Sequence, residues 1–304
     1  MLETYRVEPL YYKKVLENIV EGTAKYLVSN KIKACVLGIS GGIDSTVTAA
    51  ICKLVYDKTN IPLIGISLPC STNKADEISA ASLVGEEFCN EFKEINLQAP
   101  FETMEKFCTE ASGQESTPIS QGNIKARLRM ITLYDIASKR GGIVMDTDNL
   151  TEHYLGFYTL KGDDADLNPI GGLWKHEVYG LARYLKEVVF KDSKALEASI
   201  ALIPTDGNGV KEGGDLAQIA PNKTYDDVDE ILMAWVGLTD SIKKDVLDNQ
   251  FKYGVFFTLC GKHGKDVVER VVMRSVRSEF KRRQTPLVVD IFRGLICEKS
   301  GKLI

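Results

Sequence analysis

The chain has 304 residues, of which 44% are apolar and 26% charged, and its formal net charge is −4. This composition is typical of a globular protein with a sizeable core, and the slightly acidic balance argues against a surface that coats nucleic acid. The longest apolar runs fall well short of the roughly 20 residues that a membrane-spanning helix needs. Because the first residues show no basic-then-apolar signal pattern, we expect a cytoplasmic protein without nucleic-acid or membrane partners.

Apolar positions recur every three or four residues over residues 10–30, which predicts a first helix with one buried face. The members of this face are Leu16, Ile19, Val20, Thr23 and Leu27. Strand-like apolar runs and helical patterns then alternate: strands are predicted at 33–39, 61–68, 92–97 and 142–145, and helices at 46–56, 75–89 and 121–139. This alternation predicts an α/β fold with a single doubly wound parallel sheet and helices on both faces.

Residues 111–120 and 205–223 are rich in polar residues, glycine or proline, and both are predicted to be mobile loops, the second a lid over a site. The last third of the chain is mainly helical and ends in a predicted helix over 265–283. We therefore expect one domain over residues 1–304, made of a helix (10–30), an α/β core (33–200), the loop 205–223 and a helical part (225–295). The seven cysteines include no Cys-x-x-Cys pair and accompany only three histidines, so reduced and mostly buried thiols are expected, not a zinc site.

The segment Ser40-Gly41-Gly42-Ile43-Asp44-Ser45 follows the first predicted strand and opens a helix. Adjacent glycines allow close backbone approach to an anion, and a helix N-terminus supplies free N–H groups, so the segment predicts a phosphate cradle. It lacks both the Gly-x-x-x-x-Gly-Lys and the Gly-x-Gly-x-x-Gly patterns. Asp44 would repel phosphate unless a divalent cation lay between them. The alternative is a tight turn in which Ser45 caps the helix.

Three further segments carry charge in patterns that a turn or a solvated surface could also explain. Residues 122–130 place Lys125 and Arg129 together on a helix, where a solvated basic face is the alternative. Glu152 follows the fourth predicted strand and could join Asp44 in holding Mg²⁺, or simply stand in the first turn of a helix that Thr151 caps. The acidic segment 156–170 could supply acceptors or metal ligands, or form turns.

The Ser-Gly-Gly-x-Asp-Ser pattern resembles the signature of the PP-loop ATP pyrophosphatases, which split ATP while adenylating a substrate oxygen. Together with Gly122 to Met130, the segment from Thr147 to Glu152, and Gly156 to Ile170, the chain resembles ammonia-dependent NAD synthetases over nearly its whole length. The resemblance implies an adenine nucleotide α-hydrolase-like sheet in a homodimer. It also implies ATP-dependent amidation of deamido-NAD with ammonia, through an adenylated intermediate, to give NAD, AMP and pyrophosphate.

Carried over residue by residue, the resemblance assigns Asp44 and Lys175 as catalytic residues and Asp44 and Glu152 as Mg²⁺ ligands. The residues assigned to ATP, the co-substrate, are Gly38, Ile39, Ser40, Gly41, Gly42, Ile43, Asp44, Ser45, Thr147, Lys175 and Thr205. The residues assigned to deamido-NAD are Arg127, Lys161, Asp166 and Lys281.

The chain departs from the family pattern mainly around the predicted deamido-NAD residues. Asp146 replaces a glycine, Phe280 replaces a histidine, and Leu160 stands in the position of a lysine, which displaces Lys161 by one. The acidic segment is one residue shorter, with Gly-Asp-Asp-Ala-Asp in place of Gly-Asp-Gly-x-x-Asp. Within the same class, the alternative is another PP-loop adenylating amidotransferase or tRNA thiolase. The departures favour a second alternative from a different class, a nucleotide-binding relative without catalysis.

Overall fold

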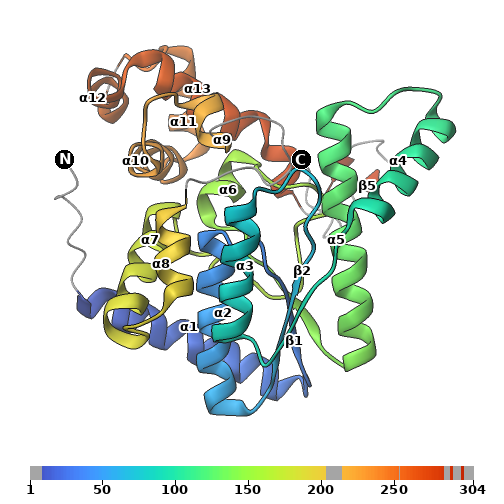
Figure 1. Ribbon diagram of the computed structural model, residues 1–304. Helices are drawn as coiled ribbons and strands as arrows, with labels where there is room; N and C mark the ends of the chain where they lie inside the picture. The colour runs from blue at the N-terminus through green and yellow to red at the C-terminus, as the bar shows by residue number, and fades with distance from the viewer. Residues whose placement is uncertain (1–8, 203–213, 253, 284–287, 290–295, 298–304) are drawn as a thin grey trace. The chain divides into compact units, whose positions relative to one another are not determined.

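The computed structural model describes residues 9–202, 214–252, 254–283, 288–289 and 296–297 (Figure 1). The chain divides into two compact units, each with its own interior. The sheet unit lies within residues 1–150 and 158–217, and the helical unit lies within residues 151–157 and 218–304. Among the described helices, none is long and apolar enough to cross a membrane.

A four-stranded parallel sheet forms the centre of the sheet unit, with the strands in the order β3-β2-β1-β4. The strands are β1 (Cys35–Gly38), β2 (Leu63–Ser67), β3 (Glu91–Glu94) and β4 (Ile143–Met145). Cys35 pairs with Leu63 on one side and with Ile143 on the other, so β1 is central. All four predicted strands are confirmed, with ends that differ from the predicted ones by at most three residues, and so is the predicted α/β class.

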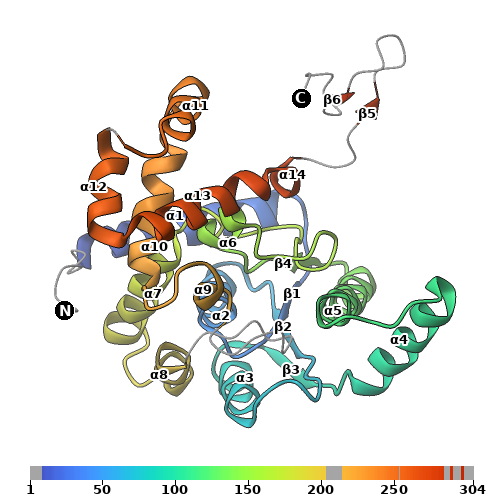
Figure 2. The same ribbon diagram turned by 90° about the horizontal axis from the view of Figure 1, so that it is seen from above.

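Helices cover both faces of this sheet, because parallel strands can be joined only by crossover segments. One face carries α1 (Pro9–Ser29), α2 (Ile43–Thr59), α3 (Ala75–Phe88), α7 (Lys175–Tyr184), the π-helical turn η1 (Leu185–Val189) and α8 (Lys194–Ala201). The other face carries α4 (Gln98–Ser112) and α5 (Pro118–Arg140). Figure 2 shows α2 and α3 on one side of the strands and α5 on the other. The sheet is therefore doubly wound, as predicted.

Alternation along β1 divides its side chains between two cores. Cys35 and Leu37 join the core beneath α1 and α2, while Val36 joins the core beneath α5. The predicted face of α1 is confirmed as buried, since Leu16, Val20, Thr23 and Leu27 are all buried and Ile19 is half-buried.

The chain changes direction across the sheet between β1 and β4. From β1 it proceeds through β2 to β3 at one edge, and α5 then returns it to β4 on the opposite side of β1. In open α/β sheets, such a reversal leaves a crevice at the carboxyl ends of the two strands, where ligands bind. The segments that follow β1 and β4 are therefore expected to form the site.

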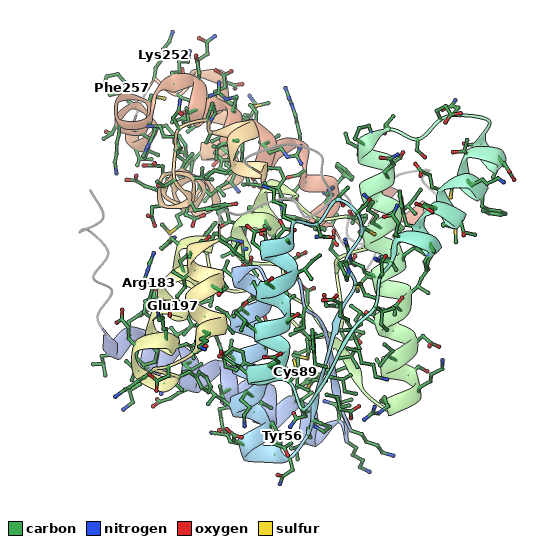
Figure 3. All side chains as sticks on the ribbon, in the orientation of Figure 1. Tyr56, Cys89, Arg183, Glu197, Lys252 and Phe257 are labelled. Atoms are coloured by element: carbon green, nitrogen blue, oxygen red, sulfur yellow. The ribbon has the colours of Figure 1, made fainter. Side chains whose placement is uncertain are left out.

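Three cysteines of the sheet unit lie close to the strands. Cys35 on β1 and Cys52 on α2 are buried and share a side-chain hydrogen bond, and Cys89 follows α3 (Figure 3). That hydrogen bond and burial raise the pKa of Cys52 well above its usual value, and burial raises the pKa of Cys89 to about 12. Cys35, Cys52, Cys70, Cys89, Cys108 and Cys260 are free thiols, as predicted, but of these six only the first three are buried.

The predicted loop over 111–120 is shorter in the structure, where residues 113–117 join α4 to α5. Residues 111 and 112 end α4, and α5 begins at Pro118, with Thr117 accepting a hydrogen bond from the Ser120 amide at 3.2 Å. Proline in the first turn and a Ser/Thr capping box are favourable helix starts, so the polar composition here marks a helix boundary. Helix α4 itself was not predicted, because Phe101 is its only fully buried residue.

The helical unit contains most of α6 (Leu150–Leu155) and the elements α10 (Tyr225–Val236), α11 (Asp240–Asp248), α12 (Gly254–His263), α13 (Lys265–Arg277) and α14 (Glu279–Arg282). The predicted helix 265–283 is thus interrupted at Ser278. The helical prediction for 225–295 is wrong at Val288–Val289, which pairs with Ile296–Cys297 as an antiparallel strand pair, β5 and β6. In the predicted loop 205–223, Gly214–Ile219 forms α9, and residues 205–213 lie outside the described residues.

A buried histidine joins α10 to α12 in the helical unit. His263 is 4% exposed, with Nε2 2.7 Å from Oε2 of Glu230 and Nδ1 3.4 Å from Oδ1 of Asp227. Lys262 binds the same Glu230 oxygen at 2.7 Å. Both carboxylates therefore face cationic or imidazole groups from α12.

Candidate active site

The loop after β1 is folded around its own hydroxyl groups. Ser45 Oγ donates to the carbonyl of Gly42 at 3.1 Å and lies 3.0 Å from Ser40 Oγ, and Ser40 Oγ accepts the Gly42 amide at 3.2 Å. Thr46 Oγ1 donates to the same Gly42 carbonyl at 2.9 Å. Gly42 is the N-cap of α2 and makes no side-chain cap, so Ser45 does not cap the helix. This is the geometry of a helix N-terminus that can receive an anion.

Gly41 fits this loop against α3 in a way that requires glycine. Its φ is +80°, and a Cβ atom there would lie 2.5 Å from the Glu77 carbonyl oxygen and 2.8 Å from the Ala81 nitrogen. Both the backbone conformation and the close approach exclude a larger residue without movement. The loop is therefore held against α3 in a fixed position at the carboxyl ends of the strands.

Asp44 stands in the first turn of α2, and its carboxylate is held from two sides. Lys175, the first residue of α7, pairs with Oδ2, and Asn149 donates to Oδ1 at 3.0 Å. Lys175 is 3% exposed and Asn149 is fully buried. The structure thus brings together the two residues that the sequence predicted to be catalytic. The Asp44 carboxylate and the Lys175 ammonium therefore lie beside the N-terminus of α2, where the phosphates of a nucleotide would bind.

The segment after β4 continues the same edge. Thr147 follows Asp146, two residues after the end of β4, and leads to Asn149. Because β1 and β4 are parallel neighbours, their carboxyl ends lie together, and the segments from Gly38 to Ser45 and from Asp146 to Asn149 share one edge of the sheet. The predicted ATP residues of the sheet unit are therefore assembled at the reversal point.

The predicted deamido-NAD residues of the sheet unit gather between α5 and the acidic segment. Arg127 Nη2 donates to the Leu160 carbonyl at 3.2 Å. Asp166 accepts from Tyr134 Oη at 3.0 Å and from the Val144 amide at 2.9 Å. Burial, and then the hydrogen bond to Asp166, raise the pKa of Tyr134 to about 12. Lys161 is exposed and lies 3.6 Å from Asp164.

The structure does not test three further predicted residues against this assembly. Glu152 and Lys281 belong to the helical unit, where Lys281 Nζ donates to the Gly156 carbonyl at 2.7 Å. Thr205 lies outside the described residues. The pairing of Asp44 with Glu152 as Mg²⁺ ligands stays a prediction.

Sequence reasoning missed two residues that shape the site, Asn149 and Tyr134, and it missed the anchoring role of Asp146. Asn149 lies inside a segment that was recognised, but its partner Asp44 is 105 positions away. Tyr134 stands one helical turn beyond the recognised 122–130 segment. Asp146 was noted only as a departure from a family pattern, although a charged residue directly after an apolar strand is a signal of a polar role at the sheet edge.

The sheet, its reversal point and the Ser-Gly-Gly-x-Asp-Ser loop define a nucleotide-binding α/β protein of the ATP pyrophosphatase type. A family model for NAD synthase matches residues 15–285, and the chain belongs to this family of enzymes. It is 31% identical over 290 residues to the NH₃-dependent NAD⁺ synthetase of Fusobacterium nucleatum, covering 93% of this chain and 98% of the relative.

Two solved structures share the architecture. The NMN synthetase of Francisella tularensis superposes with a TM-score of 0.69 at 25% identity, covering 90% of this chain and 97% of the other. The NH₃-dependent NAD synthetase of Campylobacter jejuni superposes with a TM-score of 0.65 at 23% identity, covering 91% and 99%. The second likeness bears on the fold alone.

Proposed function

We propose that the chain amidates the nicotinate carboxylate of deamido-NAD with ammonia, consuming ATP and releasing NAD, AMP and pyrophosphate. The observation that carries this proposal is the contact between Asp44 and Lys175 beside the loop Ser40–Ser45, at the reversal point of the sheet. Membership of the NAD synthase family supports the choice of substrate.

The reaction follows in two steps that need no nucleophilic side chain. A nicotinate oxygen attacks the α-phosphorus of ATP, and pyrophosphate leaves; ammonia then attacks the adenylated carboxyl carbon, and AMP leaves. The helix N-terminus and the Lys175 ammonium offset negative charge that builds up on the leaving phosphates. Positioning of two bound substrates supplies much of the remaining acceleration.

Asp44 suits a magnesium ion because a carboxylate is the ligand type that Mg²⁺ prefers, and its side chain keeps 18% exposure despite its two partners. Glu152 is the second predicted ligand. Bound Mg²⁺ would neutralise phosphate charge. Lys175 faces Asp44, so the chain itself places a cation beside this carboxylate.

The decisive experiment mixes the protein with ATP, deamido-NAD, Mg²⁺ and ammonium and quantifies NAD, AMP and pyrophosphate by chromatography. The three products are expected in equal amounts and only when all substrates are present. Replacing deamido-NAD by XMP or tRNA separates this function from those of other adenylating PP-loop enzymes. Tight ATP binding without AMP formation under any ammonia supply would contradict the proposal.

A second candidate is amidation of the mononucleotide, which would give NMN. Two observations favour it: the likeness to the Francisella tularensis NMN synthetase, and the engagement of Arg127 and Asp166 with protein groups on the predicted dinucleotide side. The ratio of kcat/KM for deamido-NAD to that for nicotinate mononucleotide decides between the candidates.

We also propose that the chain acts as a homodimer in the cytoplasm, on the ground of family membership. Sedimentation at micromolar concentration tests the first point. A fully active monomer would contradict it.

A further inference from the structure

The carboxylate of Asp146 is buried at the carboxyl end of β4 and is surrounded by hydrogen-bond donors. Its Oδ2 accepts the Ala165 amide at 2.9 Å, and its Oδ1 accepts the Asp148 amide at 2.7 Å and Asn168 Nδ2 at 3.0 Å. The side chain is only 7% exposed. A buried carboxylate with three donors is a fixed junction, because each oxygen left without a donor would be costly.

This junction joins two segments that carry predicted substrate contacts. On one side, Ala165 immediately precedes Asp166, and the adjoining Leu167 forms a parallel bridge with Met145. On the other side, Asp148 immediately follows Thr147. Asn168 reinforces the link, since the same Nδ2 donates to the Asp148 carbonyl at 2.7 Å.

We infer that Asp146 is a positioning residue that sets the segment 163–168 against the segment 146–149, and thereby aligns the pyridine nucleotide with ATP. The inference rests on the proposed function for its kinetic consequence. It also accounts for two departures of the chain together. Asp146 stands where the family has a glycine, and the acidic segment is one residue shorter than in the family. The Asp146 side chain contacts this shortened segment at the Ala165 amide.

The alternative is that Asp146 contributes to stability alone, as we expect of Glu87, a half-buried carboxylate elsewhere in the sheet unit. Glu87 supplies a matched control. It accepts the amides of Lys194 and Ala195 at 2.9 and 3.0 Å and Ser193 Oγ at 2.5 Å. Glu87 lies at the end of α3, just before β3 begins. It is therefore near the amino ends of the strands, whereas the site is at their carboxyl ends.

The test compares Asp146→Asn with Glu87→Gln. Each change removes one acceptor oxygen at nearly constant volume. For Asp146→Asn, we expect the KM for the pyridine nucleotide to rise about tenfold while the KM for ATP stays close to the wild-type value. For Glu87→Gln, we expect a lower midpoint of thermal unfolding and unchanged KM values. An Asp146→Asn protein that loses stability with both KM values unchanged would overturn the inference.

Hydrogen exchange in the substrate-free protein provides a readout that does not depend on activity. The amides of residues 164–168 are expected to exchange faster in Asp146→Asn and to be unaffected in Glu87→Gln. Should the wild type make no amide product from either pyridine nucleotide, the proposed function fails. The exchange measurement still tests whether Asp146 holds the segment 163–168 in place. Equal protection of the amides of 164–168 in wild type and Asp146→Asn would overturn that inference.

A rescue experiment tests whether the two departures are coupled. Asp146→Gly alone is expected to raise the KM for the pyridine nucleotide. Inserting one glycine between Asp163 and Asp164 in the same variant restores the pattern Gly-Asp-Gly-x-x-Asp and is expected to bring the KM back towards wild type. A doubly changed protein that binds worse than Asp146→Gly alone would overturn the coupling.

Discussion

Lys175 and Asp44 form an ion pair across 131 positions of sequence, and the lysine is almost completely buried. The pair joins the first turn of α2 to the first turn of α7, so the two predicted catalytic groups also fasten two helices. Stability and activity are therefore expected to change together when either residue is replaced.

Asp44→Asn is expected to abolish turnover and to lower the free energy of unfolding by about 3 kcal/mol, because it removes the negative charge that faces the buried Lys175 ammonium. Adding Lys175→Met removes that charge, and the double variant is expected to be more stable than Asp44→Asn. Urea unfolding and a product assay measure both effects. Equal stability of Asp44→Asn and wild type would show that the pair contributes nothing to folding.

Gly41→Ala is expected to destabilise the protein by about 1–2 kcal/mol from the positive φ alone, with a further cost from the contact with α3. The loop would have to move, so ATP binding measured by titration calorimetry should weaken. Gly172→Ala is the control, since a Cβ atom there meets nothing within 4 Å. ATP affinity unchanged in Gly41→Ala would mean that the loop does not need this position.

The helical unit should lose stability in acid. Burial by itself raises the pKa of Glu230 and of Asp227, but hydrogen bonds and the charges of His263 and neighbouring lysines outweigh it, so both pKa values are lowered. Carboxylates with depressed pKa values stabilise the fold above their unfolded values of 4.5 and 3.8. This contribution is lost as the pH falls below those values and through the folded pKa values.

Hydrogen exchange of α10 and α12 between pH 6 and pH 3 checks this expectation, and the range follows from the ordinary carboxyl pKa values near 4. In Glu230→Gln, the acid-dependent part should shrink. The same slope in wild type and variant would place the acid sensitivity elsewhere.

Lys281→Ala is expected to raise the KM for the pyridine nucleotide more than the KM for ATP. The loss of a charge-assisted hydrogen bond should lower kcat/KM for the pyridine nucleotide by roughly tenfold to hundredfold. The structure also gives Lys281 a local partner, the carbonyl of Gly156. Arg277→Ala is the control, because Arg277 is exposed at the end of α13. Unchanged kinetic constants with reduced stability would assign Lys281 to that local contact alone.

The sheet and the phosphate-binding loop were predictable from the sequence because their signals are local. Apolar runs such as that of β1 indicate strands buried on both faces, and the glycines before Asp44 indicate a strand-to-helix turn. Helix α4 carries no such signal, because one fully buried residue, Phe101, leaves no periodic apolar stripe.

The contacts of the site could not be predicted, because they depend on tertiary distance. Nothing near Lys175 in the sequence distinguishes it from an exposed lysine, yet α7 buries it against Asp44. The junction at Asp146 likewise depends on the segment 165–168 running beside β4. Spacing along the chain indicates which residues share an element, not which elements meet.

The free thiols divide between the two units, and this gives the protein built-in reporters of partial opening. Thiolates react and thiols do not, so burial and the raised pKa values protect Cys52 and Cys89 from alkylation while the sheet unit is closed. Cys260, on α12, is half-buried and belongs to the helical unit. Labelling rates followed by mass spectrometry would therefore time the opening of the sheet unit through Cys52 and Cys89, with the partly exposed Cys260 as an internal reference.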